Sequence, residues 1–295
     1  MTNLSRRTLI AGGITGATAL GAALLFAVNR FSGAARDIED VFTTPLPLPP
    51  LIDGRDIGNV VTLEAASGTT KFQHQAASRS LGFSGSYLGP VLRLHRGDTV
   101  TMTVANKLDR PTTVHWHGLL IPSDLDGGPH NAIAPGNVWQ PSLTIDQPAA
   151  TLWYHPHPHG DTARQVYLGL AGLLYVEDGS AQSLGLPNRY GVDDIPLILQ
   201  DRAFSADGLL SYDNSPAAIQ HGSRGDTLIV NGAIAPRADI PAGVVRLRLL
   251  NGANARNFRL VFADRRPMHV IANDNGFIAA PVAVSALTIA PGERY

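Results

Sequence analysis

The sequence contains no cysteine among its 295 residues. Disulfide frameworks, cysteine-ligated zinc or iron–sulfur sites and thiol enzymes are therefore excluded for this chain. Charged residues are also scarce, since Asp, Glu, Lys and Arg make up 16% of the chain, against about 25% in an average soluble domain. The balance of 23 Lys and Arg against 24 Asp and Glu gives a formal net charge of -1. Such a balance argues against the broad basic field that nucleic-acid binding requires.

Glycine and proline are plentiful, with 30 and 21 residues spread along the chain, which favours short strands joined by tight turns over long helices. Several runs alternate apolar with polar residues and are rich in β-branched side chains, which is typical of strands. They are 60–63, 91–94, 99–104 and 244–249. The sequence therefore predicts an all-β fold, with a short helix at 162–170 as the best helical candidate.

The N-terminus has the layout of an export signal. Arg6 and Arg7 precede an apolar stretch, 10–28, that contains no charged residue and is diluted by Gly and Ala. The arginine pair resembles a twin-arginine signal, which predicts a periplasmic or otherwise exported protein without stable membrane association after signal removal. A single membrane anchor is the alternative, because about 19 apolar residues just span a bilayer. A proline-rich extended linker follows at 44–50, so residues 1–44 are interpreted as signal and linker.

An internal repeat predicts two similar β-domains in tandem. The tetrapeptide Ile-Ala-Pro-Gly occurs at 133–136 and again at 289–292, and Val-Ala-Asn at 104–106 resembles Leu-Leu-Asn at 249–251. We place the domains at 45–180 and 181–295. The chain continues far beyond the first tetrapeptide but only three residues beyond the second, so the first domain is expected to be complete and the second truncated.

Two histidine pairs carry the chemistry: His115 with His117, and His155 with His157. On an extended strand, residues i and i+2 point to one face about 6.5 to 7 Å apart, so each pair presents two imidazoles side by side. That separation suits two or more metal ions better than one. Imidazole favours copper, zinc, iron or nickel, and neither segment contains the carboxylates that magnesium or calcium would require.

Other histidines are not assigned as ligands. His159 continues the spacing of the second pair, but the chain can turn at Gly160, so His159 is left out of the ligand set. Isolated histidines are more commonly surface or hydrogen-bonded polar residues than ligands. They are His74, His95, His130, His221 and His269.

Both pairs lie in longer motifs that resemble a known family. The segments are VHWHGL at 114–119, DGGP at 126–129 and QPAATLWYHPHPHG at 147–160. They resemble the first two copper motifs of the multicopper oxidases, and later segments are similar to the bacterial copper-efflux (cuprous) oxidase and laccase-like branch. The resemblance runs from about Pro45 to the last residue and identifies an N-terminal portion of such a protein.

The resemblance implies tandem cupredoxin-like Greek-key β-sandwiches with a trinuclear copper cluster. By position, His115 is implied as a ligand of the type 2 copper. The resemblance likewise implies that His117 and His155 share one type 3 copper and that His157 binds the other. Asp126 matches an acid that assists proton delivery during dioxygen reduction. The alternative for Asp126 is a turn former ahead of two glycines.

The family also requires a type 1 copper with a cysteine ligand, where substrate electrons enter, and this chain has no cysteine. Four further cluster histidines normally lie in His-X-X-His-X-His and His-Cys-His segments, and neither pattern occurs. The resemblance therefore implies half of the trinuclear ligands and no type 1 ligands. The chain alone is expected to be inactive, and a C-terminal cupredoxin domain is a possible partner.

The implied function is oxidation of cuprous ion or phenolic donors, with reduction of dioxygen to water, in copper homeostasis. A second hypothesis is a non-catalytic periplasmic protein that binds and sequesters copper. A third is a cupin-like enzyme with one metal ion, which also uses His-X-His on a β-barrel. The cupin hypothesis is disfavoured because a cupin would have a glutamate a few residues beyond the pair and a third histidine on a later strand.

Overall fold

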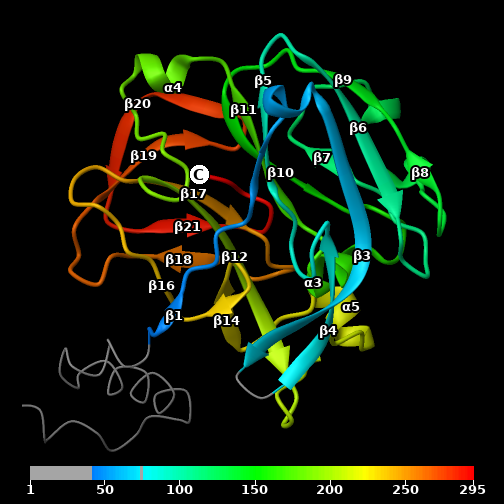
Figure 1. Ribbon diagram of the computed structural model, residues 1–295. Coiled ribbons are helices and arrows are strands. Elements are labelled where there is room, and N and C mark those ends of the chain that lie inside the picture. The colour runs from blue at the N-terminus through cyan, green and yellow to red at the C-terminus, as the bar shows by residue number, and fades with distance from the viewer. Residues whose placement is uncertain (1–41, 74–75) are drawn as a thin grey trace, which may run out of the picture. The chain divides into compact units, whose positions relative to one another are not determined.

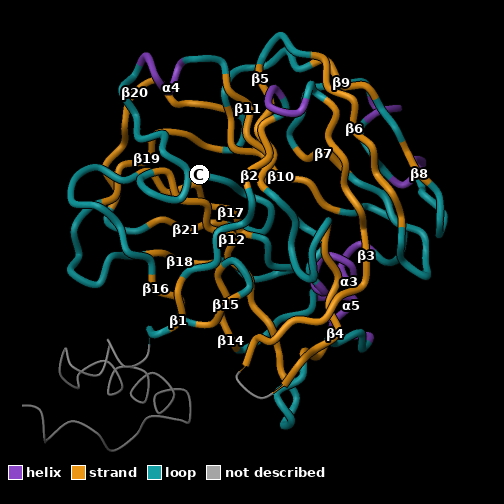
Figure 2. The backbone as a smooth tube through the Cα atoms, viewed as in Figure 1, coloured by secondary structure: helices purple, strands orange, loops and turns teal. Residues whose placement is uncertain are grey.

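Strands dominate the computed structural model, which describes residues 42–73 and 76–295. Figure 2 shows only short helices among the strands. Residues Thr44–Tyr295 form one compact unit, and the expected export signal in 1–41 lies outside the described residues. The predicted all-β class is confirmed.

Residues 51–177, called the first half below, form a sandwich of two sheets (Figure 1). One sheet has the order β2 (Leu51–Asp53), β5 (Val91–His95), β11 (Gly172–Glu177), β10 (Ala150–His155) and β7 (His115–His117). The other has β4 (Ala76–Phe83), β3 (Val60–Gln73), β6 (Thr99–Asn106) and β8 (Val138–Trp139), with β9 (Ser142–Thr144) paired to β6. A single buried cluster draws apolar side chains from both sheets, including Val61, Leu92 and Trp116. Alternating apolar residues thus face inward, as period two requires.

Residues 194–295, called the second half below, are built around the long strand β12 (Asp194–Phe204). Its sheet also contains β13 (Leu210–Ser211), β14 (Thr227–Val230), β15 (Ala233–Ile234) and β17 (Arg246–Asn251). Two-stranded sheets add β18 (Phe258–Leu260) with β21 (Leu287–Ile289), β19 (Met268–Asn273) with β20 (Gly276–Val284), and β1 (Thr44–Pro45) with β16 (Pro236–Arg237). The second half has its own buried cluster. A further cluster joins the halves, where Trp153 and Tyr175 pack with Ile198 and Leu250.

Within 42–73 and 76–295, helices are confined to connections. The 3-10 helices are η1 (Arg55–Ile57), η2 (Ser123–Leu125) and η3 (Pro129–Asn131), and the α-helices are α3 (Thr162–Leu168), α4 (Ser180–Ser183) and α5 (Pro216–His221). The helix predicted at 162–170 ends at Leu168 because Gly169 adopts a φ of 124°. The strand predicted at 244–249 begins at Arg246, since Val244 is exposed to solvent. Among the described residues, no helix has the length and hydropathy needed to span a membrane.

The sequence repeat has a counterpart in hydrogen bonding. The Asn106 side chain donates to the carbonyls of Arg110 and Ile133 and accepts from the Leu108 amide. In the same way, the Asn251 side chain donates to the carbonyls of Arg256 and Ile289 and accepts from the Ala253 amide. Each asparagine ends a strand that pairs in parallel with the first long strand of its half, β6 with β3 and β17 with β12. The repeated tetrapeptide therefore serves as a partner for an equivalent buried amide in each half.

Candidate metal centre

The two histidine motifs meet through the antiparallel pairing of β7 with β10. His115 lies opposite His155, and His117 lies opposite Trp153. Side chains at i and i+2 share one face of a strand, so three of the four predicted ligands gather on the same face of this strand pair. The pairing thus brings together residues that lie far apart in the sequence.

The imidazoles of His115, His117 and His155 form a compact group. One nitrogen from each ring lies within 4.8 Å of the others. The closest pair is His117 Nδ1 and His155 Nε2, which are 3.2 Å apart. Ring centroids of His115 and His117 are 5.4 Å apart, closer than the backbone spacing of about 6.5 to 7 Å. The side chains therefore lean toward one another.

His157 lies beside this group rather than in it. Its ring centroid is 5.6 Å from that of His115 and 6.1 Å from that of His155. Strand β10 ends at His155, and the His157 backbone amide donates to the Thr113 hydroxyl at 2.6 Å. The His157 and His159 side chains are exposed. The second pair is thus divided between a buried strand residue and an exposed loop residue.

Backbone carbonyls orient two of the rings. The Nδ1 atom of His115 lies 2.9 Å from the Asp126 carbonyl oxygen, and that of His155 lies 2.9 Å from the Pro156 carbonyl oxygen. A carbonyl can only accept, so Nδ1 carries the proton in both rings and Nε2 keeps its lone pair. Ligand histidines in metal sites are commonly held in this way. The donor set therefore fits a metal that prefers imidazole.

Burial keeps two of the grouped imidazoles, those of His117 and His155, neutral. Desolvation lowers the pKa of the His117 imidazole to about 4, and the positive charge of Arg294 acts in the same direction. Desolvation also holds the pKa of the His155 imidazole well below its usual value. Metals bind neutral imidazole, so protons compete weakly with a metal at these two rings at neutral pH.

Asp126, the acid that the family resemblance implied, lies next to His115. One carboxylate oxygen is 3.1 Å from His115 Nδ1. Burial raises the pKa of the Asp126 carboxyl, although the adjacent His115 opposes this effect. Residue 127 must be glycine, because its φ is 72° and a Cβ there would lie 1.7 Å from the Val114 carbonyl oxygen. Gly127 thus permits the loop that holds Asp126 against β7.

Several neighbours of the centre were not predicted from sequence. The Trp153 ring stacks on His155 with centroids 4.0 Å apart and lies 5.2 Å from the His117 centroid. Its position in the WYH segment, two residues before His155, was the available signal. Asn275 and Arg294, from the second half, reach the strand ends at Gly118 and Thr151. No local pattern in the sequence indicates those contacts.

Comparison with known proteins adds family information. Residues 64–181 match the multicopper oxidase family. A bacterial laccase-like multi-copper oxidase, CueO from Ochrobactrum sp., has 53% sequence identity and a TM-score of 0.82 over 85% of this chain and 56% of its own. That protein has oxidase activity towards lignin model compounds and lignosulfonate. The McoA multicopper oxidase of Aquifex aeolicus has 35% identity and a TM-score of 0.79 over the same shares of the two chains. The predicted cupredoxin-like β-sandwich fold agrees with these neighbours.

Curated relatives carry a different name. A cell division protein FtsP from Xenorhabdus nematophila is 46% identical over 251 residues, which are 85% of this chain and 52% of that protein. The Escherichia coli cell division protein FtsP is 44% identical over 250 residues. This chain spans about half the length of these relatives.

Proposed function

On the premise that residues 64–181 form a domain of the multicopper oxidase family, we propose that His115, His117, His155 and His157 bind copper. The observation that carries this proposal is the group of three imidazole nitrogens within 4.8 Å of one another. In the proposed arrangement His115 holds the type 2 copper, His117 and His155 share one type 3 copper, and His157 holds the other. Bound copper would supply one-electron chemistry for reducing dioxygen to water.

The protein residues would then orient the site and supply protons. The carbonyls of Asp126 and Pro156 fix the ring orientations of His115 and His155. Reduction of dioxygen to water consumes protons as well as electrons. Asp126 is suited to hold one, because burial raises the pKa of its carboxyl next to His115. We assign Asp126 a role in proton delivery on this basis.

The activity proposed for the whole protein is oxidation of cuprous ion or a phenolic donor in copper homeostasis. Because the chain spans about half the length of the relatives, we assign the remaining cluster ligands and the type 1 site to a further cupredoxin-like domain. The separate buried clusters of the two halves support domains at 45–180 and 181–295. Export through the twin-arginine-like segment at 1–44 completes this proposal.

A second candidate is copper binding without turnover, in a sequestering protein. The name of the curated relatives, cell division protein FtsP, favours a role other than turnover and extends this candidate to cell division. Both candidates require copper at the same histidines. They differ in whether dioxygen is consumed once the remaining ligands are present.

Equilibrium dialysis with copper tests the shared step. A variant with alanine at His115, His117, His155 and His157 is expected to lose the copper that the parent retains. The matched control is His130→Ala, which removes a histidine whose ring is hydrogen-bonded to the Ser123 carbonyl and which is not in the grouped three. Equal copper content in the parent and the quadruple variant would exclude the proposal.

Dioxygen uptake by the protein together with the further domain then separates the two candidates. Uptake that Asp126→Asn slows, with copper content unchanged, supports the oxidase and the proton-delivery role. Copper retention without uptake supports the sequestering protein.

A further inference from the structure

We propose that Asn275 and Arg294 act as positioning residues that fix the two histidine strands relative to each other. We call this pair the clamp. Both residues belong to the second half of the chain, whereas the strands they hold, β7 and β10, belong to the first. The inference rests on the proposed function, because it assigns the clamp a role in arranging His117 and His155.

The first contact of the clamp is at the end of β7. Asn275 lies in the turn between β19 and β20, and its side-chain amide donates to the Gly118 carbonyl at 3.0 Å. Gly118 directly follows His117, the last residue of β7. The position of this carbonyl therefore constrains the backbone from which the His117 side chain projects.

The second contact is on β10. Arg294 Nε donates to the Thr151 carbonyl at 3.2 Å, and its Nη2 donates to the Asn275 side-chain oxygen at 3.1 Å. Arg294 is itself fixed, because Nη1 donates to the Gly292 carbonyl at 2.9 Å and lies 2.9 Å from an Asp274 carboxylate oxygen. The guanidinium thus links the ends of both histidine strands through one continuous set of hydrogen bonds.

The clamp acts where the pairing of the two strands ends. The pairing runs from His155 opposite His115 to Trp153 opposite His117, and goes no further. Gly118 and Thr151 lie just beyond this last pair. Hydrogen bonds of a strand pair normally fix its separation. Beyond that point Gln147, just before β10, donates to the Gly118 carbonyl at 3.1 Å, and Asn275 and Arg294 add the connection from the second half.

Glycine at 118 is explained by the same contact. Its φ is 96°, and a Cβ at this position would lie 2.8 Å from Arg294 Nη2 and 2.7 Å from Leu152 Cδ2. The glycine that follows His-Trp-His therefore leaves room for the guanidinium. Gly118 belongs to the VHWHGL motif of the metal centre, and the close approach of Arg294 from the second half thus restricts which residue can occupy this position.

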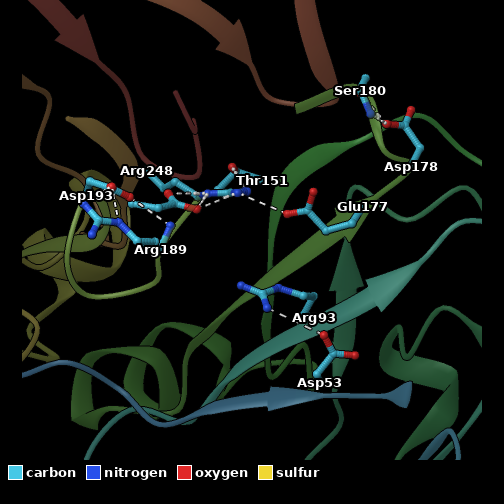
Figure 3. A network of polar contacts seen from close by, with 10 residues as sticks. Asp53, Arg93, Thr151, Glu177, Asp178, Ser180, Arg189, Asp193 and Arg248 are labelled. Atoms are coloured by element: carbon cyan, nitrogen blue, oxygen red, sulfur yellow. Dashed lines mark hydrogen bonds and ion pairs between the residues drawn. The ribbon is translucent and has the colours of Figure 1, made fainter. Parts of the chain in front are cut away.

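Thr151 is also held by a second buried arginine. Arg248 Nη1 donates to the Thr151 hydroxyl at 3.4 Å, and Arg248 pairs with Glu177 at 3.1 Å (Figure 3). Arg248 also pairs with Asp194 at 2.8 Å. Two arginines of the second half therefore contact the backbone and the side chain of one residue on β10. Movement of β10 relative to the second half would have to break both sets of contacts, and movement relative to β7 would have to break the Arg294 and Asn275 set.

The test uses the variants Asn275→Ala and Arg294→Lys. Lysine keeps the positive charge but lacks the planar fork that reaches two acceptors. The matched control is Asn254→Ala, since Asn254 also donates from the second half to a carbonyl of the first, that of Ala163 at 2.7 Å. Ala163 lies in α3 and belongs to neither β7 nor β10.

The first measurement is the imidazole nitrogen NMR spectrum of metal-free protein at neutral pH. We expect both clamp variants, but not the control, to shift the His117 and His155 ring signals, because the contact between Nδ1 and Nε2 changes. Ring signals that stay unchanged in folded Asn275→Ala and Arg294→Lys proteins would overturn the clamp. If one of the two clamp variants does not fold, the other is compared with Asn254→Ala.

The second measurement is copper affinity. Residues that orient ligands typically contribute about 10- to 100-fold to metal affinity, and we expect a loss of that size in the clamp variants alone. A parent protein that binds no copper would refute the proposed function, while the metal-free spectra would still decide whether the clamp positions the rings. An affinity loss equal in the clamp variants and Asn254→Ala would count against the clamp.

Discussion

His117 Nδ1 lies 3.2 Å from His155 Nε2, although the two histidines belong to different strands. At this distance two unprotonated nitrogens would bring their lone pairs together, so either a proton or a metal ion must lie between them. Because His155 Nδ1 faces a carbonyl and carries the proton of the neutral ring, His117 Nδ1 is the donor in the metal-free protein. A metal at this site would replace that proton.

Metal-free protein should lose stability as the pH falls from about 6.5 to 4. Burial lowers the folded pKa of His117 from 6.5 to about 4, so the unfolded chain binds more protons in this window and the free energy of unfolding decreases as the pH falls. NMR titration of the His117 ring should give a midpoint near 4. A midpoint near 6.5 would contradict the prediction.

Gly127→Ala should destabilise the protein far more than Gly136→Ala. Both glycines have positive φ, 72° and 79°, but a Cβ at 127 would lie 1.7 Å from a carbonyl oxygen, whereas a Cβ at 136 meets nothing within 4 Å. The control variant should cost about 1 to 2 kcal/mol of backbone strain, and Gly127→Ala more than about 4 kcal/mol. Urea denaturation measures both values. Similar losses for the two variants would show that the loop moves freely away from β7.

Asn106→Ala and Asn251→Ala should each lower the free energy of unfolding by about 3 kcal/mol or more, because each leaves buried backbone groups without partners. Both side chains are fully buried and make three equivalent hydrogen bonds. Since the residues lie in different halves, the losses should add in the double variant. Thermal and urea unfolding of the set provide the check. A large loss for only one asparagine would mean that the equivalent hydrogen bonds differ in strength.

Arg248→Met should cost about 3 to 5 kcal/mol, the usual result of removing one partner from a buried ion pair. Asp194 and Glu177 would be left facing an uncharged side chain, and the Asp194 side chain is only 1% exposed. The double variant Arg248→Met with Asp194→Leu should recover part of this loss. A double-mutant cycle from urea unfolding measures the coupling. Additive losses in that cycle would indicate that the two charges do not stabilise each other.

Much of the fold could be predicted from sequence because the relevant signals are local. Alternation of apolar and polar residues predicted β5 and β6, and the Ile-Ala-Pro-Gly repeat predicted a structural repeat that the Asn106 and Asn251 hydrogen bonds now explain. Two histidine pairs at i and i+2 predicted neighbouring imidazoles, and His115, His117 and His155 do gather. The proposed ligand role of these histidines remains a prediction.

Other features depend on contacts between distant segments. Nothing near Arg294 in the sequence indicates that it reaches Thr151, since the contact follows from how the two halves pack. The position of His157 outside the grouped three results from the end of β10 at His155, where Pro156 interrupts the pairing. Sequence spacing alone treats His155 and His157 as equivalent.

The stacking of Trp153 on His155 gives the protein a built-in optical reporter. Indole fluorescence is sensitive to a paramagnetic ion nearby, and this ring lies against two of the three grouped imidazoles. With only three tryptophans in the chain, replacing Trp116 and Trp139 would leave emission from this single ring. Metal entry and loss could then be followed in real time without attaching a label.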